Sequence, residues 1–415
     1  MNAPMNNPRF AWAVVFAAFA FNYFLSALLR AVVATLAPEF ARELQLGAAD
    51  LGLLAGAYFL GFACMQLPLG VALDRYGARR VLLCFLVLAV LGCIGFALAR
   101  NFSQLVVARF LIGLGVSASL MAPLAAFVRM YDRPLQLRLN SWMLMSGSLG
   151  MVASTLPVQA LLPVVGWRGL FWLVAAALAV GMVCIAAAAP ADPEPRAEPR
   201  AGGGYRRIAA HPAFMRALPL GFFTYGGLIA VQALWAGPWM TQVVGLTAQG
   251  AAQGLFVINL TMLCSFLAWG VVIPRLVQRG WGQERLISAG WPVGVLVLLC
   301  IVVLGHNAGA GWLALWCACT SVIALTQPSV AQAFSKDEAG RALSAFNLAI
   351  FAGVFTCQWG MGLAIDAMVG AGWARADSHR AAMALLLLGT TAAGVWYWLY
   401  PRMVARRSSV TSAQG

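Results

Sequence analysis

The apolar runs of this chain constrain its fold more than any other feature of the sequence. Twelve stretches of about 20 residues or more are almost free of charge, and each can cross a bilayer as a helix. With 62% hydrophobic and 10% charged residues, the chain lacks the charged surface of a soluble domain, in which about 25% of residues are charged. We predict an all-α membrane protein with twelve transmembrane helices, at 10–36, 48–73, 78–98, 102–128, 138–163, 167–189, 214–241, 248–274, 284–305, 309–332, 342–369 and 380–400.

The net charge of +14 is explained by membrane topology. If the N-terminus lies in the cytoplasm and the spans alternate, most of the 27 Lys and Arg residues fall on the cytoplasmic side. This asymmetry is the positive-inside bias of membrane proteins. It predicts a multi-pass protein of a bacterial inner membrane, with the lipid bilayer as its surroundings, both termini in the cytoplasm and no nucleic-acid partner.

The two halves of the chain repeat each other at a spacing of 200 residues: Pro38 aligns with Pro238, Gly70 with Gly270 and Arg75 with Arg275. Such a repeat predicts two pseudo-symmetric six-helix bundles. The Pro-rich and Gly-rich segment between them forbids a continuous helix and is typical of a linker. We predict an N-terminal bundle at 1–189, a cytoplasmic linker at 190–213, a C-terminal bundle at 214–400 and a cytoplasmic tail at 401–415.

A short charged loop, GVALDRYGARR, lies between the second and third apolar runs. It resembles the signature loop of the major facilitator superfamily, whose members transport small solutes; the sequence assigns no subfamily. The resemblance implies two bundles that work by alternating access. It also implies that the loop is a conformational latch and does not contact substrate. The latch residues are Gly70, Asp74, Arg75, Gly77, Arg79 and Arg80.

The first apolar run carries a polar face. Asn22, Ser26 and Arg30 recur at every fourth position, with Tyr23 beside them. In the family that the loop resembles, the first, fourth, seventh and tenth helices line the substrate cavity. Arg30 lies well inside the hydrocarbon, where a charge costs at least ~2.5–3.5 kcal/mol, so we expect it to face protein or water.

The fourth run carries a second buried arginine, Arg109, at the start of RFLIGLG, which resembles the family's fourth-helix motif. Beyond the first three residues of each predicted span, no acid other than Asp366 is found inside one. Two guanidinium groups without acidic partners would be neutralised by an anionic substrate. The alternative is that Arg109 bonds backbone carbonyls between helices and that Arg30 extends outward to the membrane surface.

The C-terminal half offers neutral groups. Tyr225, Gln232 and Trp235 follow helical spacing on the seventh run, and Asn347 and Gln358 lie on the eleventh. We expect these side chains to supply hydrogen bonds and apolar walls to the substrate. Trp239 continues the same spacing, although its position beside Pro238 also suits an anchor at the membrane interface.

The predicted function is secondary active transport of a small organic or inorganic anion. Asp366 is a candidate for ion coupling, because an intramembrane carboxylate can carry a proton; it can equally cap a helix or pair at the interface. Coupling through Asp366 supports the alternative of proton-coupled efflux of amphipathic compounds. A second alternative is a membrane sensor that binds ligand without transporting it.

The sequence predicts neither an enzyme nor a cofactor or metal site. The nine cysteines form no CxxC pair, and the three histidines lie at loops or edges of the predicted spans. A soft-metal path is an alternative, because thiolates and thioethers select such ions. We expect a monomer whose partner is a small-molecule substrate. The residues of that soft-metal path would be Cys64, Met65, Met143 and Met145.

Overall fold

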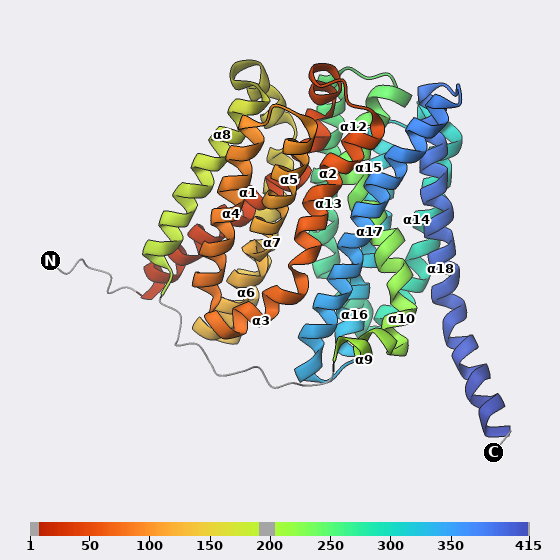
Figure 1. The fold of residues 1–415 in the computed structure, drawn as a ribbon. Coiled ribbons are helices and arrows are strands. Elements are labelled where there is room, and N and C mark those ends of the chain that lie inside the picture. Colours follow the sequence, from red (N-terminus) through yellow and green to blue (C-terminus); the bar gives the residue numbers. More distant parts are fainter. Residues whose placement is uncertain (1–7, 191–203, 414–415) are drawn as a thin grey trace. The chain divides into compact units, whose positions relative to one another are not determined.

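The computed structural model describes residues 8–190 and 204–413, which form helices and no β-strand (Figure 1). Residues 8–190 form α1 (Pro8–Glu43), α2 (Ala48–Cys64), α3 (Gln66–Tyr76), α4 (Ala78–Leu98), α5 (Phe102–Val116), α6 (Ala118–Met130), α7 (Arg133–Ala153) and α8 (Leu156–Ala188). Residues 204–413 form α9 (Tyr205–Ala210), α10 (Pro212–Pro219), η1 (Leu220–Tyr225), α11 (Gly226–Ala230), η2 (Val231–Trp235), α12 (Ala236–Pro238), η3 (Trp239–Val243), α13 (Ala248–Gln278), α14 (Gln283–Leu304), η4 (Gly305–Asn307), α15 (Ala310–Thr320), η5 (Ser321–Leu325), α16 (Thr326–Gln332), α17 (Lys336–Gly370) and α18 (Arg375–Ala413).

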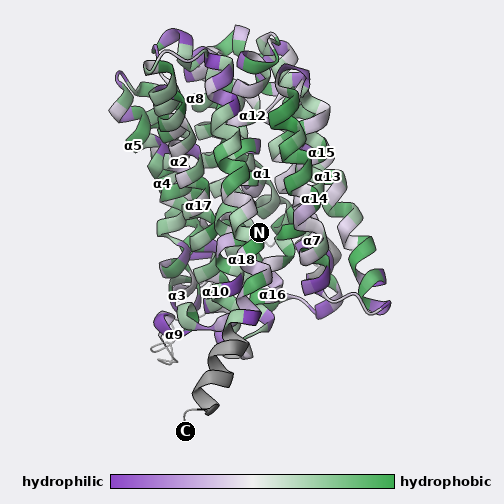
Figure 2. Ribbon diagram, turned by 90° about the vertical axis from the view of Figure 1, so that its right-hand side faces the viewer, coloured by the Kyte–Doolittle hydropathy of each residue, from purple (hydrophilic) through white to green (hydrophobic). Residues whose placement is uncertain are grey.

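The predicted apolar runs all fall on helical backbone. Among the described residues, 10 helices are long and apolar enough to cross a membrane, and an eleventh is counted if α2 and α3, which bend by 44°, form one span. α8 contains the end of the fifth predicted run and nearly all of the sixth, and its backbone has a kink between them at Gly166, where φ is 64°. Hydrophobic residues follow the lengths of the helices and hydrophilic ones gather at their ends (Figure 2). The prediction of an all-α membrane fold is confirmed.

The chain divides into two compact units. Unit 1 holds the described residues of 1–36 and 57–200, and unit 2 holds those of 37–56 and 201–415. The end of α1 and the first half of α2 therefore belong to unit 2, although the sequence analysis assigned them to the N-terminal bundle. Of the predicted linker, residues 191–203 lie outside the described residues, and Tyr205–Ala210 forms α9.

The repeat at a spacing of 200 residues is visible in the backbone. α1 ends at Glu43 and α2 begins at Ala48, and 200 positions later η3 ends at Val243 and α13 begins at Ala248. Both turns place one residue in the left-handed region: Gln45 at φ 51° and Gly245 at φ 81°. Gln45 is the only residue other than glycine with positive φ in the described chain, and such a residue is uncommon.

Glycines set the helix spacing inside unit 1. A Cβ built on Gly113 of α5 would lie 1.9 Å from the carbonyl oxygen of Tyr58, and one built on Gly115 would lie 2.2 Å from the backbone nitrogen of Ala89. Backbones that approach this closely exclude every side chain larger than hydrogen at the contact. The glycines of the RFLIGLG stretch therefore pack α5 against α2 and α4.

The seventh predicted run is a helix of mixed type. The α-helical pieces α10, α11 and α12 are each followed by a π-helical segment, η1, η2 and η3 respectively. A π-helical turn holds more residues than an α-turn and is frequent at functional sites. Because the turn is wider, side chains spaced for an α-helix do not stay on one face here.

Candidate functional site

Arg109 lies in the interior of unit 1 and is fully buried. Its Nη2 donates a hydrogen bond of 2.6 Å to the carbonyl oxygen of Leu29, and its guanidinium lies 4.9 Å from the ring centroid of Tyr58. Nε and Nη1 are buried without a hydrogen-bond partner. The charged or titratable neighbours of Arg109 are Tyr58 and Cys93. Thus no carboxylate of the described residues neutralises this guanidinium.

Arg30 lies close to the same aromatic pair of α2. Its guanidinium is 5.7 Å from the ring of Phe62, and its side chain hydrogen-bonds Tyr23. The rings of Tyr58 and Phe62 are 6.2 Å apart, so each arginine lies over one ring of a stacked pair. The structure therefore brings Arg30, Tyr23 and Arg109 into one neighbourhood.

Tyr58 and Phe62 were not singled out by the sequence analysis. Tyr58 donates a hydrogen bond of 3.2 Å to the carbonyl oxygen of Ser26 and joins α1 to α2. The available signal was two aromatic residues one helical turn apart in the second run. That pattern is ordinary in an apolar helix, and only the arginines above the rings give it significance.

Asn22 and Ser26 are fully buried in unit 1. Asn22 faces α8, because a Cβ built on Gly181 of that helix would lie 2.4 Å from the Nδ2 of Asn22. The same Nδ2 donates a hydrogen bond of 2.9 Å to the carbonyl oxygen of Ala18. The Oδ1 of Asn22 and the Oγ of Ser26 have no hydrogen-bond partner among the described residues. Asn22 thus lies at the contact between α1 and α8, one position from Tyr23.

The polar groups of unit 2 point to different neighbours. Gln232 donates a hydrogen bond of 2.9 Å to Oδ1 of Asn259 on α13, and both residues are buried. Trp235 donates to the carbonyl oxygen of Gln358 at 3.2 Å, whereas Trp239 donates to that of Ala308 at 2.9 Å. The wide π-turns between these residues explain the divergence. Asn259 was missed because a single amide in a long apolar run carries no periodic signal.

The remaining predicted residues of unit 2 also lie in its interior. Gln358 is fully buried, its Nε2 donates to the carbonyl oxygen of Ala230 at 3.5 Å, and its Oε1 has no partner among the described residues. Asn347 is buried on α17. Tyr225 packs against two apolar clusters of unit 2.

Asp366 caps a helix. Its Oδ1 accepts a hydrogen bond of 3.0 Å from the backbone N–H of Ala48, and its Oδ2 accepts one of 2.8 Å from that of Ala49. These are the first two residues of α2, whose N–H groups have no partner within the helix. Glycines permit the contact, since a Cβ built on Gly362 of α17 would lie 2.4 Å from the carbonyl oxygen of Ala48. Of the roles considered for Asp366, capping is the one the geometry displays.

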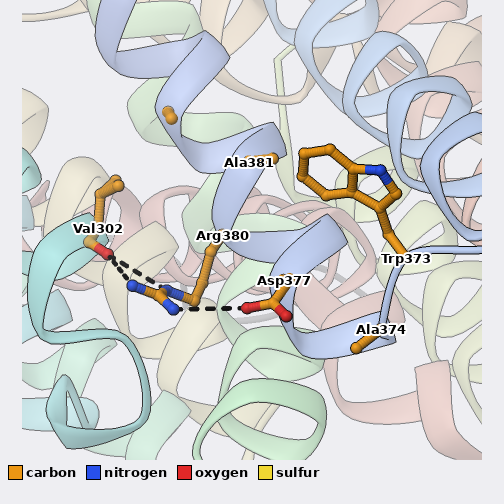
Figure 3. A pocket seen from close by; sticks show the side chains of 7 residues that line it. Val302, Trp373, Ala374, Asp377, Arg380 and Ala381 are labelled. Atoms are coloured by element: carbon orange, nitrogen blue, oxygen red, sulfur yellow. Dashed lines mark hydrogen bonds and ion pairs between the residues drawn. The ribbon is translucent and has the colours of Figure 1, made fainter.

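A cavity of about 390 Å³ adjoins this cap in unit 2. Its polar and aromatic lining includes Arg42, Trp235, Asp366, Arg375 and His379. A more open groove of about 440 Å³ lies at the start of α18. There Arg380 donates to the carbonyl oxygen of Val302, near the end of α14, and pairs with Asp377 at 3.4 Å (Figure 3). Arg380 thus hydrogen-bonds a carbonyl group near the C-terminal end of α14 and pairs with a carboxylate.

The charged loop of unit 1 contains one residue with positive φ. Gly77, at φ 86°, joins α3 to α4. Arg79 donates a hydrogen bond to the carbonyl oxygen of Ala186 in the last turn of α8, where a cation is favourable. Asp74 and Arg75 are exposed, and Asp74 makes no hydrogen bond or ion pair with the residues that the structure describes.

No group of three or more His, Cys, Asp or Glu side chains among the described residues is arranged to hold a metal ion.

A family model described as Major Facilitator Superfamily matches residues 19–356. The chain is 25% identical over 264 residues to the multidrug transporter MdfA of Shigella boydii serotype 4, covering 61% of this chain and 62% of that protein. It is 32% identical over 166 residues to the 4-hydroxybenzoate transporter PcaK of Pseudomonas putida, covering 39% of this chain and 36% of that protein. The matched region thus spans less than two thirds of the length of these relatives.

Among solved structures, a bacterial homolog of the human lysosomal transporter Spinster in an inward-facing and unoccupied conformation matches with a TM-score of 0.74. The match covers 96% of this chain and 98% of that chain at 16% identity. At this identity the likeness shows the fold alone.

Proposed function

Because this chain belongs to the Major Facilitator Superfamily, we propose that it is a secondary active transporter that moves a small anion across the membrane by alternating access. One observation carries the proposal. Arg109 is fully buried with two nitrogens unsatisfied, and no carboxylate of the described residues is near it.

A negatively charged solute is the partner that this environment lacks. An isolated charge inside a protein is costly unless it is paired, and a guanidinium offers a carboxylate two parallel N–H donors. Arg30, with its contacts to Phe62 and Tyr23, adds a second positive charge beside aromatic rings. Among anions, a small organic carboxylate with a flat ring suits this combination best. The resemblance to a 4-hydroxybenzoate transporter supports that substrate class.

The test is counterflow of radiolabelled 4-hydroxybenzoate in proteoliposomes. Arg109→Gln and Arg30→Gln should each lower the initial rate about tenfold or more, since a hydrogen bond to a charged group contributes about 1.5–3 kcal/mol. Arg168→Gln is the matched control. Arg168 likewise lies over an aromatic ring, with its guanidinium 4.0 Å from the ring centroid of Trp167, and donates to the carbonyl oxygen of Ala99.

The Arg30→Gln variant keeps the test informative if Arg109→Gln fails to fold. Arg30 is only half-buried, so replacing it is expected to disturb packing less than replacing Arg109. Folding of each variant is checked by its melting temperature. Counterflow that is unchanged in folded Arg30→Gln and Arg109→Gln proteins would reject the anion site.

Proton-coupled export of amphipathic compounds is the second candidate, supported by the resemblance to a multidrug transporter over 61% of this chain. It differs from the first in its dependence on Asp366. Cells that express the protein should then resist lipophilic cations in a pH-dependent manner that Asp366→Asn abolishes. Resistance without any anion counterflow would favour this candidate over the first.

The proposed setting is a bacterial inner membrane with both termini in the cytoplasm and a single chain as the working unit. In this setting the residues Gly70 to Arg80 form a latch on the cytoplasmic side. Alkaline phosphatase fusions are active only outside the cytoplasm, so fusions at residues 45 and 77 should be active and inactive, respectively. The reverse pattern would overturn the orientation.

A further inference from the structure

The cavity of about 390 Å³ in unit 2 is lined by both apolar and charged side chains. Trp235, Pro238 and Ile365 are among the apolar ones, while Arg375 and His379 lie one helical turn apart at the start of α18. The volume is at the lower end of what small-molecule sites occupy.

His379 is held in one tautomer by its own helix. The residue is 9% exposed, and its Nδ1 lies 2.9 Å from the carbonyl oxygen of Arg375. A carbonyl oxygen only accepts, so Nδ1 carries the hydrogen. In the neutral ring Nε2 therefore carries the lone pair, and no described residue forms a hydrogen bond with it. The cavity is thus lined by a buried imidazole with a free proton-accepting nitrogen.

The other charges of the cavity leave Arg375 and His379 available. Both oxygens of Asp366 accept backbone N–H groups of α2. Arg42 is paired with Glu39 at 2.5 Å. Arg375 forms no ion pair with a described carboxylate. A ligand in the cavity therefore meets one guanidinium that has no described carboxylate partner, and one imidazole beside an indole ring.

We propose that this cavity binds a small aromatic carboxylate together with a proton, with the proton on Nε2 of His379 and the carboxylate between His379 and Arg375. The inference rests on the proposed anion transport and names a coupling ion for it. Nε2 takes the proton from bulk water, and the new N–H donates to the carboxylate. One negative and one positive charge enter together, so the net charge of the cavity does not change.

At this site, binding of the anion and binding of the proton strengthen each other by thermodynamic linkage. A bound carboxylate stabilises the imidazolium, so carboxylate binding draws a proton from solution. The groups that face His379 from the packed elements are Arg375 of its own helix, Asp366 of α17 and Arg42 of α1. The lining residues of η3 and α2 are not titratable. Of these groups, His379 is the one whose ordinary pKa of about 6.5 lies near neutrality.

The experiment is isothermal titration of the purified full-length protein with benzoate at about pH 7.5, above the ordinary pKa of histidine. Titration in two buffers of different ionisation enthalpy gives the number of protons taken up. Benzoate that binds in this cavity should bring one proton with it, so the wild-type protein should take up more protons for each benzoate bound than the His379→Gln protein. Benzamide, which has the same shape without the charge, should bind without proton uptake and far more weakly.

Two variants distinguish the residue that takes up the proton from the residue that only binds the anion. His379→Gln should abolish proton uptake and weaken benzoate about tenfold. Arg375→Gln should weaken benzoate by a similar factor and retain the uptake at saturation. His306→Gln is the matched control, because His306 is an exposed histidine that does not line this cavity. Melting temperatures establish that each variant is folded.

Equal benzoate affinity and proton uptake in wild-type and His379→Gln proteins would overturn the proposal, and so would the absence of benzoate binding by the folded wild-type protein. Neither result depends on counterflow. Loss of counterflow in the Arg109 variant together with unchanged titration of His379→Gln would leave the proposed function standing and reject only this site.

Discussion

The backbone N–H of Ala48 donates a hydrogen bond of 3.0 Å to Asp366, a residue 318 positions later in the chain. In the second repeat the equivalent helix, α13, is capped by the side chain of Thr247, which accepts from Gly250 at 3.1 Å. The position 200 residues before Thr247 is Gly47, which has no side chain to cap α2. Asp366 on α17 supplies the missing acceptor, so the two repeats cap equivalent helix ends by different means: Asp366 accepts from the N–H groups of residues 48 and 49, and Thr247 accepts from that of residue 250.

Removing the cap should loosen the start of α2. We expect Asp366→Ala to lower stability by about 1 kcal/mol, the usual effect of losing a helix N-cap, and Asp366→Asn to lower it less because one oxygen remains. Hydrogen exchange at the amides of residues 48 and 49, together with the melting temperature, reports the change. Asp377→Ala, which removes a carboxylate in an exposed ion pair, should leave exchange at these amides as in the wild type.

Gly113 should tolerate no side chain. We expect Gly113→Ala to destabilise the protein by about 1–3 kcal/mol or to prevent folding, because its Cβ would collide with the backbone of Tyr58. Gly270→Ala is the control, since no atom lies within 4 Å of a Cβ there and alanine favours a helix over glycine. Thermal unfolding in detergent measures both variants. A Gly113→Ala protein as stable as the wild type would contradict the close packing of α5 on α2.

The two glycines of the charged loop should differ in their effect on stability. Gly77 has φ 86°, so Gly77→Ala should cost about 1–2 kcal/mol of backbone strain. Gly70 is helical with open space around it, so Gly70→Ala should keep or raise the melting temperature. If Gly70→Ala is stable and still slows transport, its role lies in the conformational cycle, as the proposed latch requires. Equal melting temperatures for the two variants would refute the strain at Gly77.

Gln232 and Asn259 should behave as a coupled pair. Gln232→Leu leaves the buried Oδ1 of Asn259 without its donor, which should cost about 1–3 kcal/mol. Asn259→Leu should have a similar effect, and the double variant should be more stable than the sum of the two losses implies. A double-mutant cycle on unfolding free energies measures this coupling. Additive losses would mean that the two amides do not interact.

Much of the fold could be read from the sequence because a bilayer leaves the backbone few choices. A long apolar run must satisfy its own backbone hydrogen bonds, and a helix does so within the segment. The repeat was readable for a similar reason, since Pro38 and Pro238 lie at the same distance before the turns that contain Gln45 and Gly245.

The candidate site was only partly predictable. Arg30 and Arg109 stand out in any apolar sequence because burying a charge is costly. Their aromatic neighbours Tyr58 and Phe62 do not, since they are chemically ordinary in such a helix. His379 was set aside as a residue at the edge of a span, yet it lies beside Trp235 with a ring-centroid distance of 6.1 Å.

The sequence by itself determined the all-helical membrane fold, the 200-residue repeat and the presence of buried charge, because these follow from the local chemistry of a chain placed in lipid. Only the tertiary structure decided which side chains meet. Wide π-turns redirected the residues of the seventh run, glycines set which backbones touch, and the carboxylate of Asp366 found its donors on a distant helix. Such contacts depend on packing between segments far apart in the chain, which no local pattern encodes.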